Sequence, residues 1–227
     1  MDVTHMKHTK RVLLLVAAVL LLAVFAFVAY ILIWQWDNLQ VLGAALTQPK
    51  ETIVREMEQQ HAEEASFMKE QEISVQIPTI EQDKGLMEGT VSPQELKEAL
   101  GLRVSENAPS ESTSEAILEA CVRQLYSYRV DLFAQLGELE RRWKTAWYAL
   151  PVEDQDKAHR NDFFLDALDE CYDMEVDADN RVLSLLDDCR AKLSGIGADP
   201  KLADQLWDSY CDDKRAAKTY YLKEYID

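Results

Sequence analysis

Residues 113–150 read TSEAILEACVRQLYSYRVDLFAQLGELERRWKTAWYAL, and this stretch decides the fold. Its apolar residues recur at steps of three or four, the period of one buried face on an α-helix. Thr113 or Ser114 can cap the helix start, and Pro151 closes the helix. Gly137 is its only weak point. The apolar positions are Ile117, Cys121, Leu125, Tyr128, Leu132, Leu136, Leu139, Trp143, Ala146 and Leu150.

Residues 152–194 contain neither glycine nor proline, which predicts one long helix. Their apolar stripe is close to a coiled-coil repeat and is broken only by Glu175. The acidic segment around Glu175 is therefore the one place where the chain could instead reverse direction. The stripe consists of Phe164, Leu168, Cys171, Glu175, Ala178, Val182, Leu185, Cys189 and Leu193.

A third helix follows a glycine-containing turn. Asp199 is its predicted N-cap and Pro200 its first residue, and it ends near Tyr225. Helices joined by short turns pack antiparallel. The sequence therefore predicts an all-α fold in which 113–227 forms an antiparallel three-helix bundle with a long, partly bare helical hairpin.

Residues 12–36 read VLLLVAAVLLLAVFAFVAYILIWQW and carry no charge. A helix of this length spans ~37 Å, enough to cross a bilayer. A cleaved signal peptide is the alternative, but its apolar part would be shorter. We therefore expect an uncleaved, single-pass signal anchor.

The flanks of this segment predict its orientation. Basic residues precede it and aromatic residues gather at its far end, where rings favour the membrane interface. The positive-inside rule then leaves the stub 1–11 in the cytoplasm and places the C-terminal domain on the extracytoplasmic side of the cell membrane. The expected interface residues are Lys7, Lys10, Arg11, Tyr30, Trp34 and Trp36.

Two polar segments separate the anchor from the bundle. Residues 37–76 have a narrow helical stripe and are predicted to form a helical stalk, with self-association as one role. Residues 77–112 contain Pro and Gly and are interpreted as a linker with a short helix at 93–101. Ser92 and Glu95 form a capping box at the start of that helix.

The predicted extracytoplasmic part is strongly acidic. Removing residues 1–36 takes away three of the 24 basic and one of the 41 acidic residues, so 21 basic and 40 acidic residues give a formal charge of −19. No basic stripe is present that could neutralise phosphates, which excludes nucleic-acid binding. Such a surface attracts cations or basic partners, although solvation of helix faces is the simpler explanation.

All four cysteines lie in this part, and an even number in an oxidising compartment favours disulfides. In a hairpin that turns near residue 155, Cys121 and Cys189 lie at equal height on the buried stripes, which makes them the first candidate pair. If the chain reverses near 175–180, Cys171 pairs with Cys189 instead, leaving Cys121 for Cys211. A buried cysteine can also act simply as a small apolar side chain.

No catalytic or metal-binding pattern is found in the sequence. HExxH, CxxC and GxSxG are absent, as is a phosphate-binding glycine-rich loop. Residues 177–180 resemble the start of a calcium loop, but the required glycine is missing. The sequence predicts no enzyme activity, cofactor or metal. The aromatic pair Tyr220 and Tyr221 near the C-terminus is a candidate for contact with a partner.

The predicted bundle contains five stretches that support a resemblance to known proteins. They are LGELERRW (136–143), WYALP (147–151), VLSLLDDCRAKL (182–193), GADPKLADQLW (197–207) and KTYYLKEY (218–225). With them, the region from Leu125 to Leu222 resembles uncharacterised exported proteins of Gram-positive bacteria. These have an N-terminal anchor and a helical unit with a Lys-x-Tyr-Tyr-Leu-like tail. The resemblance implies an N-terminal anchor, a C-terminal helical unit and a location in the cell envelope. It does not point to any particular activity.

These observations lead to two hypotheses. The first is a non-enzymatic, membrane-anchored helical module that binds another protein, or itself, or organises the envelope. The second is an extracytoplasmic sensory or ligand-binding module that acts with a membrane partner, because a stub of 11 residues cannot signal alone. The sequence does not indicate any small-molecule ligand.

Overall fold

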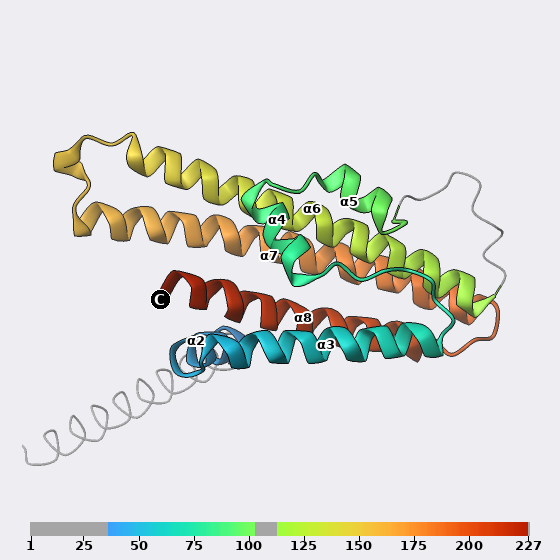
Figure 1. Ribbon diagram of the computed structural model, residues 1–227. Coiled ribbons are helices and arrows are strands. Elements are labelled where there is room, and N and C mark those ends of the chain that lie inside the picture. The colour runs from blue at the N-terminus through green and yellow to red at the C-terminus, as the bar shows by residue number, and fades with distance from the viewer. Residues whose placement is uncertain (1–35, 103–112, 227) are drawn as a thin grey trace, which may run out of the picture. The chain divides into compact units, whose positions relative to one another are not determined.

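The computed structural model describes residues 36–102 and 113–226, and within these ranges the chain is helical and contains no strand (Figure 1). It forms two compact units, which divide at 57/58 and 212/213. The elements are α2 (Trp36–Thr47), α3 (Lys50–Glu70), α4 (Ile80–Glu88), α5 (Pro93–Ala99), α6 (Ser114–Tyr148), the short 3-10 helix η1 (Val152–Asp154), α7 (Lys157–Gly195) and α8 (Lys201–Ile226).

The second unit, residues 58–212, is built on the antiparallel hairpin of α6 and α7 (Figure 1). Thr113 caps α6 by accepting a hydrogen bond from the amide of Ala116 at 3.3 Å. At the same end of the hairpin, where α7 leads into α8, Gly197 adopts a left-handed φ of 75°, and Asp199 accepts a hydrogen bond from the amide of Lys201 at 3.0 Å. The predicted hairpin and the turn into the last helix are confirmed.

The predicted stripe of α7 is confirmed only in its C-terminal half. There, one face is buried and consists of Ala178, Val182, Leu186, Cys189 and Leu193, with Leu186 in place of the predicted Leu185, which is only partly buried. Further towards the hairpin turn, Leu168 and Cys171 are exposed, so the stripe is not buried along its whole length. The helix passes through 175–180 without reversing.

Helix α6 buries a second face that the single predicted stripe did not include. Its residues are Leu118, Val122, Tyr126, Val130, Phe133 and Gly137. Besides α7, the helices α4 and α5 pack against α6, and both come from the segment interpreted as a linker (Figure 1). The predicted helix at 93–101 is present as α5, capped by Ser92, but α4 was not expected.

The N-terminus of α4 carries a complete capping box. The amide of Gln82 donates to the hydroxyl of Thr79 at 3.3 Å, and the Gln82 side chain accepts from the amide of Thr79 at 2.9 Å. At its C-terminus, Gly89 adopts a φ of 73°. The two caps give this short helix defined ends, which fixes where its buried residues Asp83 and Leu86 lie.

Gly137 is where α4 comes closest to α6. A Cβ atom added there would lie well inside van der Waals contact with the backbone carbonyl oxygen of Met87, the penultimate residue of α4. The absence of a side chain at Gly137 therefore allows α4 to pack against α6.

The first unit consists, in its described part, of α2, the start of α3 and the end of α8. Its core includes Val41, Ala45, Ile53, Met57, Ala217 and Tyr220. Lys218 donates a hydrogen bond to the side chain of Asn38 at 2.6 Å, joining α8 to α2. The ammonium of Lys50 lies 5.5 Å from the ring centroid of Tyr220, joining α3 to α8.

Within residues 36–102 and 113–226, no helix is long and apolar enough to cross a bilayer. The predicted anchor at 12–36, except for its last residue, lies outside the described ranges, as do the expected interface residues Lys7, Lys10, Arg11, Tyr30 and Trp34. Trp36 is the first residue of α2.

Candidate functional site

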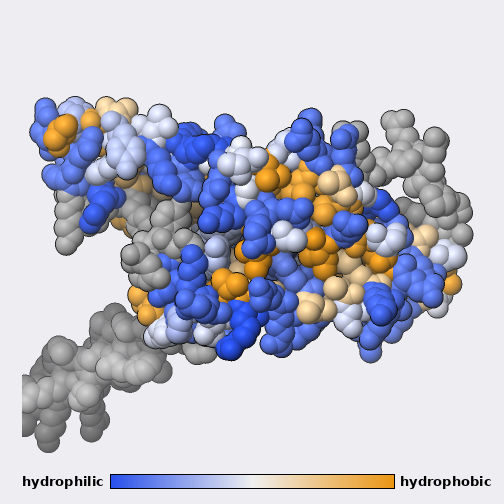
Figure 2. All heavy atoms as spheres, viewed as in Figure 1, coloured by the Kyte–Doolittle hydropathy of each residue, from blue (hydrophilic) through white to orange (hydrophobic). Residues whose placement is uncertain are grey.

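The end of the hairpin nearest η1 exposes large apolar side chains. The largest exposed fractions are those of Tyr148 at 75%, the last residue of α6, and Val152 at 84%, the first residue of η1. Four more follow along α7 and are Leu165, Leu168, Tyr172 and Val176. In Figure 2 this end of the hairpin, at the upper left, is mostly hydrophilic with hydrophobic residues interspersed. The four residues of α7 are spaced by three, four and four and so share one helix face, and exposed apolar side chains gathered on one face indicate an interaction site.

Aromatic rings hold the two helices together behind this surface. The ring centroid of Phe163 on α7 lies 5.2 Å from that of Trp143 and 5.6 Å from that of Trp147, both in edge-to-face geometry. Such pairs contribute about 0.5–1.5 kcal/mol beyond the area that they bury. Arg142 and Glu170 form an ion pair across the same helices. The exposed residues therefore lie on a braced scaffold.

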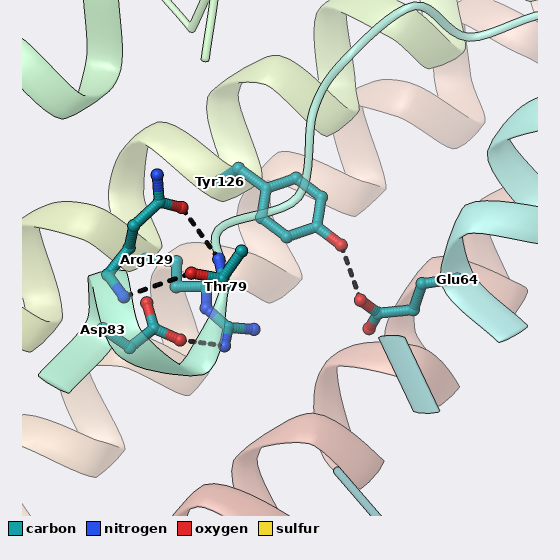
Figure 3. Close-up of polar contacts among 6 residues, drawn as sticks. Glu64, Thr79, Asp83, Tyr126 and Arg129 are labelled. Atoms are coloured by element: carbon teal, nitrogen blue, oxygen red, sulfur yellow. Dashed lines mark hydrogen bonds and ion pairs between the residues drawn. The ribbon is translucent and has the colours of Figure 1, made fainter. Parts of the chain in front are cut away.

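A buried polar cluster lies deeper in the second unit (Figure 3). Arg129 of α6 donates to the carboxylate of Asp83 on α4 at 2.6 Å, and the Asp83 side chain is only 2% exposed. Burial disfavours the charge of Arg129, but the adjacent carboxylate outweighs it and raises the pKa of the guanidinium. The pair is therefore ionised inside the protein and connects α4 to α6.

Glu64 on α3 extends this cluster to α8. Its carboxylate accepts hydrogen bonds from the hydroxyl of Tyr126 at 2.8 Å and from the hydroxyl of Ser209 at 2.6 Å. Burial and the neighbouring carboxylate raise the pKa of the Tyr126 phenol, which keeps the proton on the donor. Through Glu64, residues far apart in the sequence hold three helices together.

The cluster is arranged for support rather than for chemistry at a surface. Its acid and base are paired with each other across α4 and α6, and its hydroxyls donate to Glu64. A third connection has the same character, because the Tyr210 hydroxyl of α8 donates to Asp179 of α7 at 2.8 Å. We therefore assign these contacts to the framework that holds the hairpin.

Sequence reasoning missed the polar cluster. Asp83 and Arg129 are 46 residues apart, and Glu64 and Ser209 are 145 apart, so no local motif joins them. One signal was available: Arg129 lies among the apolar positions Leu125, Val130 and Phe133 of α6. A charge in such a run requires a buried partner.

His61 predicts a pH dependence of stability. Burial, and then the charge of Arg129, lower its pKa below the ordinary value of 6.5. The folded protein thus binds this proton less readily than the unfolded chain, so stability falls as the pH drops below about 6.5. We expect urea midpoints at pH 7 and pH 5 to differ less for His61→Gln than for the wild type. An equal difference in both proteins would contradict this.

Comparison with protein-family models, curated proteins and solved structures finds no match to this chain. Within the described residues, no group of three or more His, Cys, Asp or Glu side chains is placed to hold a metal ion.

The four cysteines are thiols in the structure, so the predicted disulfide is not present. The geometric expectation behind it is nevertheless met, because the side chains of Cys121 and Cys189 are buried and in hydrogen-bond contact across α6 and α7. Cys171 is exposed and Cys211 is partly buried. The hydrogen bond to Cys189, together with burial, raises the pKa of the Cys121 thiol.

Thiol labelling should separate these cysteines. A maleimide added to the folded, reduced protein is expected to modify Cys171 fastest and Cys121 and Cys189 slowest, because reaction requires an accessible thiolate. Peptide mass spectrometry after timed quenching measures the order. The same experiment without reductant serves as the control for a disulfide. Rapid labelling of Cys121 in the reduced, folded protein would contradict the buried contact.

The aromatic pair proposed for partner contact lies in the first unit. Tyr220 is buried, and its ring meets that of Tyr221 edge-to-face at 5.2 Å between centroids. With Lys50 over the Tyr220 ring, this residue packs into its own unit. The exposed residues of α7 are thus the more accessible candidate, and the predicted apolar stripe had included one of them, Leu168.

Proposed function

We propose that this protein is a non-enzymatic, membrane-anchored module whose extracytoplasmic helical part binds another protein. The observation that carries the proposal is the exposed apolar surface of α7, formed by Leu165, Leu168, Tyr172 and Val176. These residues lie at spacings of three, four and four, so they share one helix face. A helix face of this kind is a typical docking surface for a protein partner.

The location rests on the N-terminal sequence. The uncharged segment 12–36 is long enough to span a bilayer, and the basic residues before it favour a cytoplasmic N-terminus. The acidic remainder would then face the extracytoplasmic side, where it is repelled by anionic lipid headgroups.

Site-specific photo-crosslinking in intact cells tests the binding function. A photoreactive residue replaces Leu168 in the full-length protein, and a second variant carries it at Ser184, which is also exposed on α7 but lies outside the face. We expect a defined protein adduct from position 168 and none from position 184. If position 168 gives no adduct and the full-length protein is a monomer, the proposal fails.

Orientation is tested separately with the exposed Cys171. A membrane-impermeant maleimide is expected to label this thiol in intact cells whose outer layers admit the reagent. Cells opened by detergent provide the control for full reactivity. Labelling only after opening would place the hairpin in the cytoplasm and overturn the extracytoplasmic location.

A further inference from the structure

The apolar face of α7 is accompanied by a row of exposed aspartates. Each of its four apolar residues is followed directly by an aspartate, so the pairs Leu165–Asp166, Leu168–Asp169, Tyr172–Asp173 and Val176–Asp177 repeat along the helix. Consecutive residues are ~100° apart around a helix. The aspartates therefore form their own row alongside the apolar one, and Asp162 extends it by one turn.

Both rows face solvent. The aspartates at 162, 166, 169, 173 and 177 are all exposed, and so are the four apolar residues. The side of α7 that meets α6 is a different one, since Phe163 contacts Trp143 and Glu170 pairs with Arg142. A partner lying on the apolar row would thus meet one continuous line of negative charge along its flank.

The apolar row and the aspartate row together indicate which kind of partner can bind this face of α7. A second copy would bring a second aspartate row against the first, and like charges in close contact are destabilising. An anionic lipid surface is repelled for the same reason. A helix with apolar residues at steps of three and four and with Lys or Arg on one flank satisfies both rows.

We propose that the α7 face binds a cationic amphipathic helix of another protein. The apolar row supplies the buried contact, and the aspartate row sets the register and speeds the encounter. This inference rests on the proposed function, because it names the partner chemistry of the same surface. It goes further by requiring positive charge on the partner.

The test measures binding of a synthetic amphipathic peptide of Leu and Lys to the full-length protein in nanodiscs of neutral lipid. Fluorescence anisotropy is recorded at low and at physiological salt. The matched peptide has Glu in place of every Lys. We expect the Lys peptide to bind, with an affinity that falls as salt rises, and the Glu peptide not to bind.

Variants locate the binding site. Leu168→Ser with Tyr172→Ser is expected to weaken binding of the Lys peptide by about tenfold or more, the usual effect of removing buried anchors. A triple variant of the row, Asp166→Asn, Asp169→Asn and Asp173→Asn, is expected to weaken it about tenfold at low salt and to flatten the salt dependence. Circular dichroism verifies that the exposed substitutions leave the helices intact.

A charge-matched control removes three acids elsewhere: Glu58→Gln, Asp188→Asn and Asp208→Asn, all exposed positions. The affinity of this control variant for the Lys peptide is expected to differ from that of the wild type by less than twofold, whereas the row variant loses about tenfold. Equal weakening by both triple variants would mean attraction to net charge alone and would overturn the proposal. Equal binding of the Glu peptide would overturn it as well.

The two proposals fail in different ways. A crosslinked partner at position 168 that contributes an uncharged or acidic segment overturns the cationic helix and leaves protein binding intact. A dimer of the full-length protein that Leu168→Ser dissociates would identify a second copy as the occupant, with the same consequence for the cationic helix. Absence of both an adduct and peptide binding would remove both proposals.

Discussion

Asp83→Ala is expected to lower the free energy of unfolding by about 3–5 kcal/mol, the usual loss when one member of a buried ion pair is removed. The Asp83 side chain is 2% exposed and its partner Arg129 only 10%. Without the carboxylate, the guanidinium would remain desolvated and charged. Urea unfolding followed by circular dichroism at pH 7 measures the change.

Two control variants test whether the loss at Asp83 comes from burial of the ion pair. Lys97 and Asp131 form an ion pair at the same 2.6 Å, but the Asp131 side chain is 45% exposed. Asp131→Ala is therefore expected to cost less than about 1 kcal/mol. The double variant Asp83→Leu with Arg129→Met should recover most of the loss, since it leaves no unpaired charge. Equal losses for Asp83→Ala and Asp131→Ala would contradict the buried pair.

Gly137→Ala is expected to lower stability by about 1–3 kcal/mol, the range for overpacking a close contact. Alanine favours a helix over glycine by about 1 kcal/mol, so intrinsic propensity alone predicts the opposite sign. The new methyl group would meet the backbone carbonyl of Met87, which cannot rotate away as a side chain could. Helix α4 would have to move off α6.

Hydrogen exchange detects this movement directly. Amides of α4 should lose protection in Gly137→Ala, while those in the middle of α7 change little. Gly43→Ala is the matched control, because a Cβ at this position in α2 would meet nothing within 4 Å. It is expected to raise stability by about 0.5–1 kcal/mol. A stabilised Gly137→Ala protein would show that α4 does not pack closely there.

Some of the fold could be predicted because its signals are local. The period of α6, the capping residues Thr113 and Ser92, and the turn at Gly197 each involve a few neighbouring residues. The C-terminal half of α7 also follows its pattern, since Val182 and Cys189 are buried as their spacing predicts. The thiols of Cys121 and Cys189 meet because equal rise along two antiparallel helices places them at one height.

The rest depends on tertiary contacts that no local pattern encodes. Pro78, Gly85 and Gly89 give the segment before α5 the composition of a linker, yet its capping box and Gly137 of α6 turn it into a packed helix. On α7, Leu168 has the spacing of a core residue and is exposed. The polar cluster combines four segments, so only the structure brings its members together.

Glu64 and Asp83 bind residues that are far from them in the sequence, and this affects when the polar cluster can form during synthesis of the chain. Both acids emerge from the ribosome before Tyr126 and Arg129, and Ser209 follows 145 residues after Glu64. Until then the early segment presents hydrated carboxylates instead of a bare apolar face, which limits aggregation of an incomplete chain. Helices α6 and α8 then supply the donors, so assembly of this part finishes only after Ser209 of α8 has been synthesised.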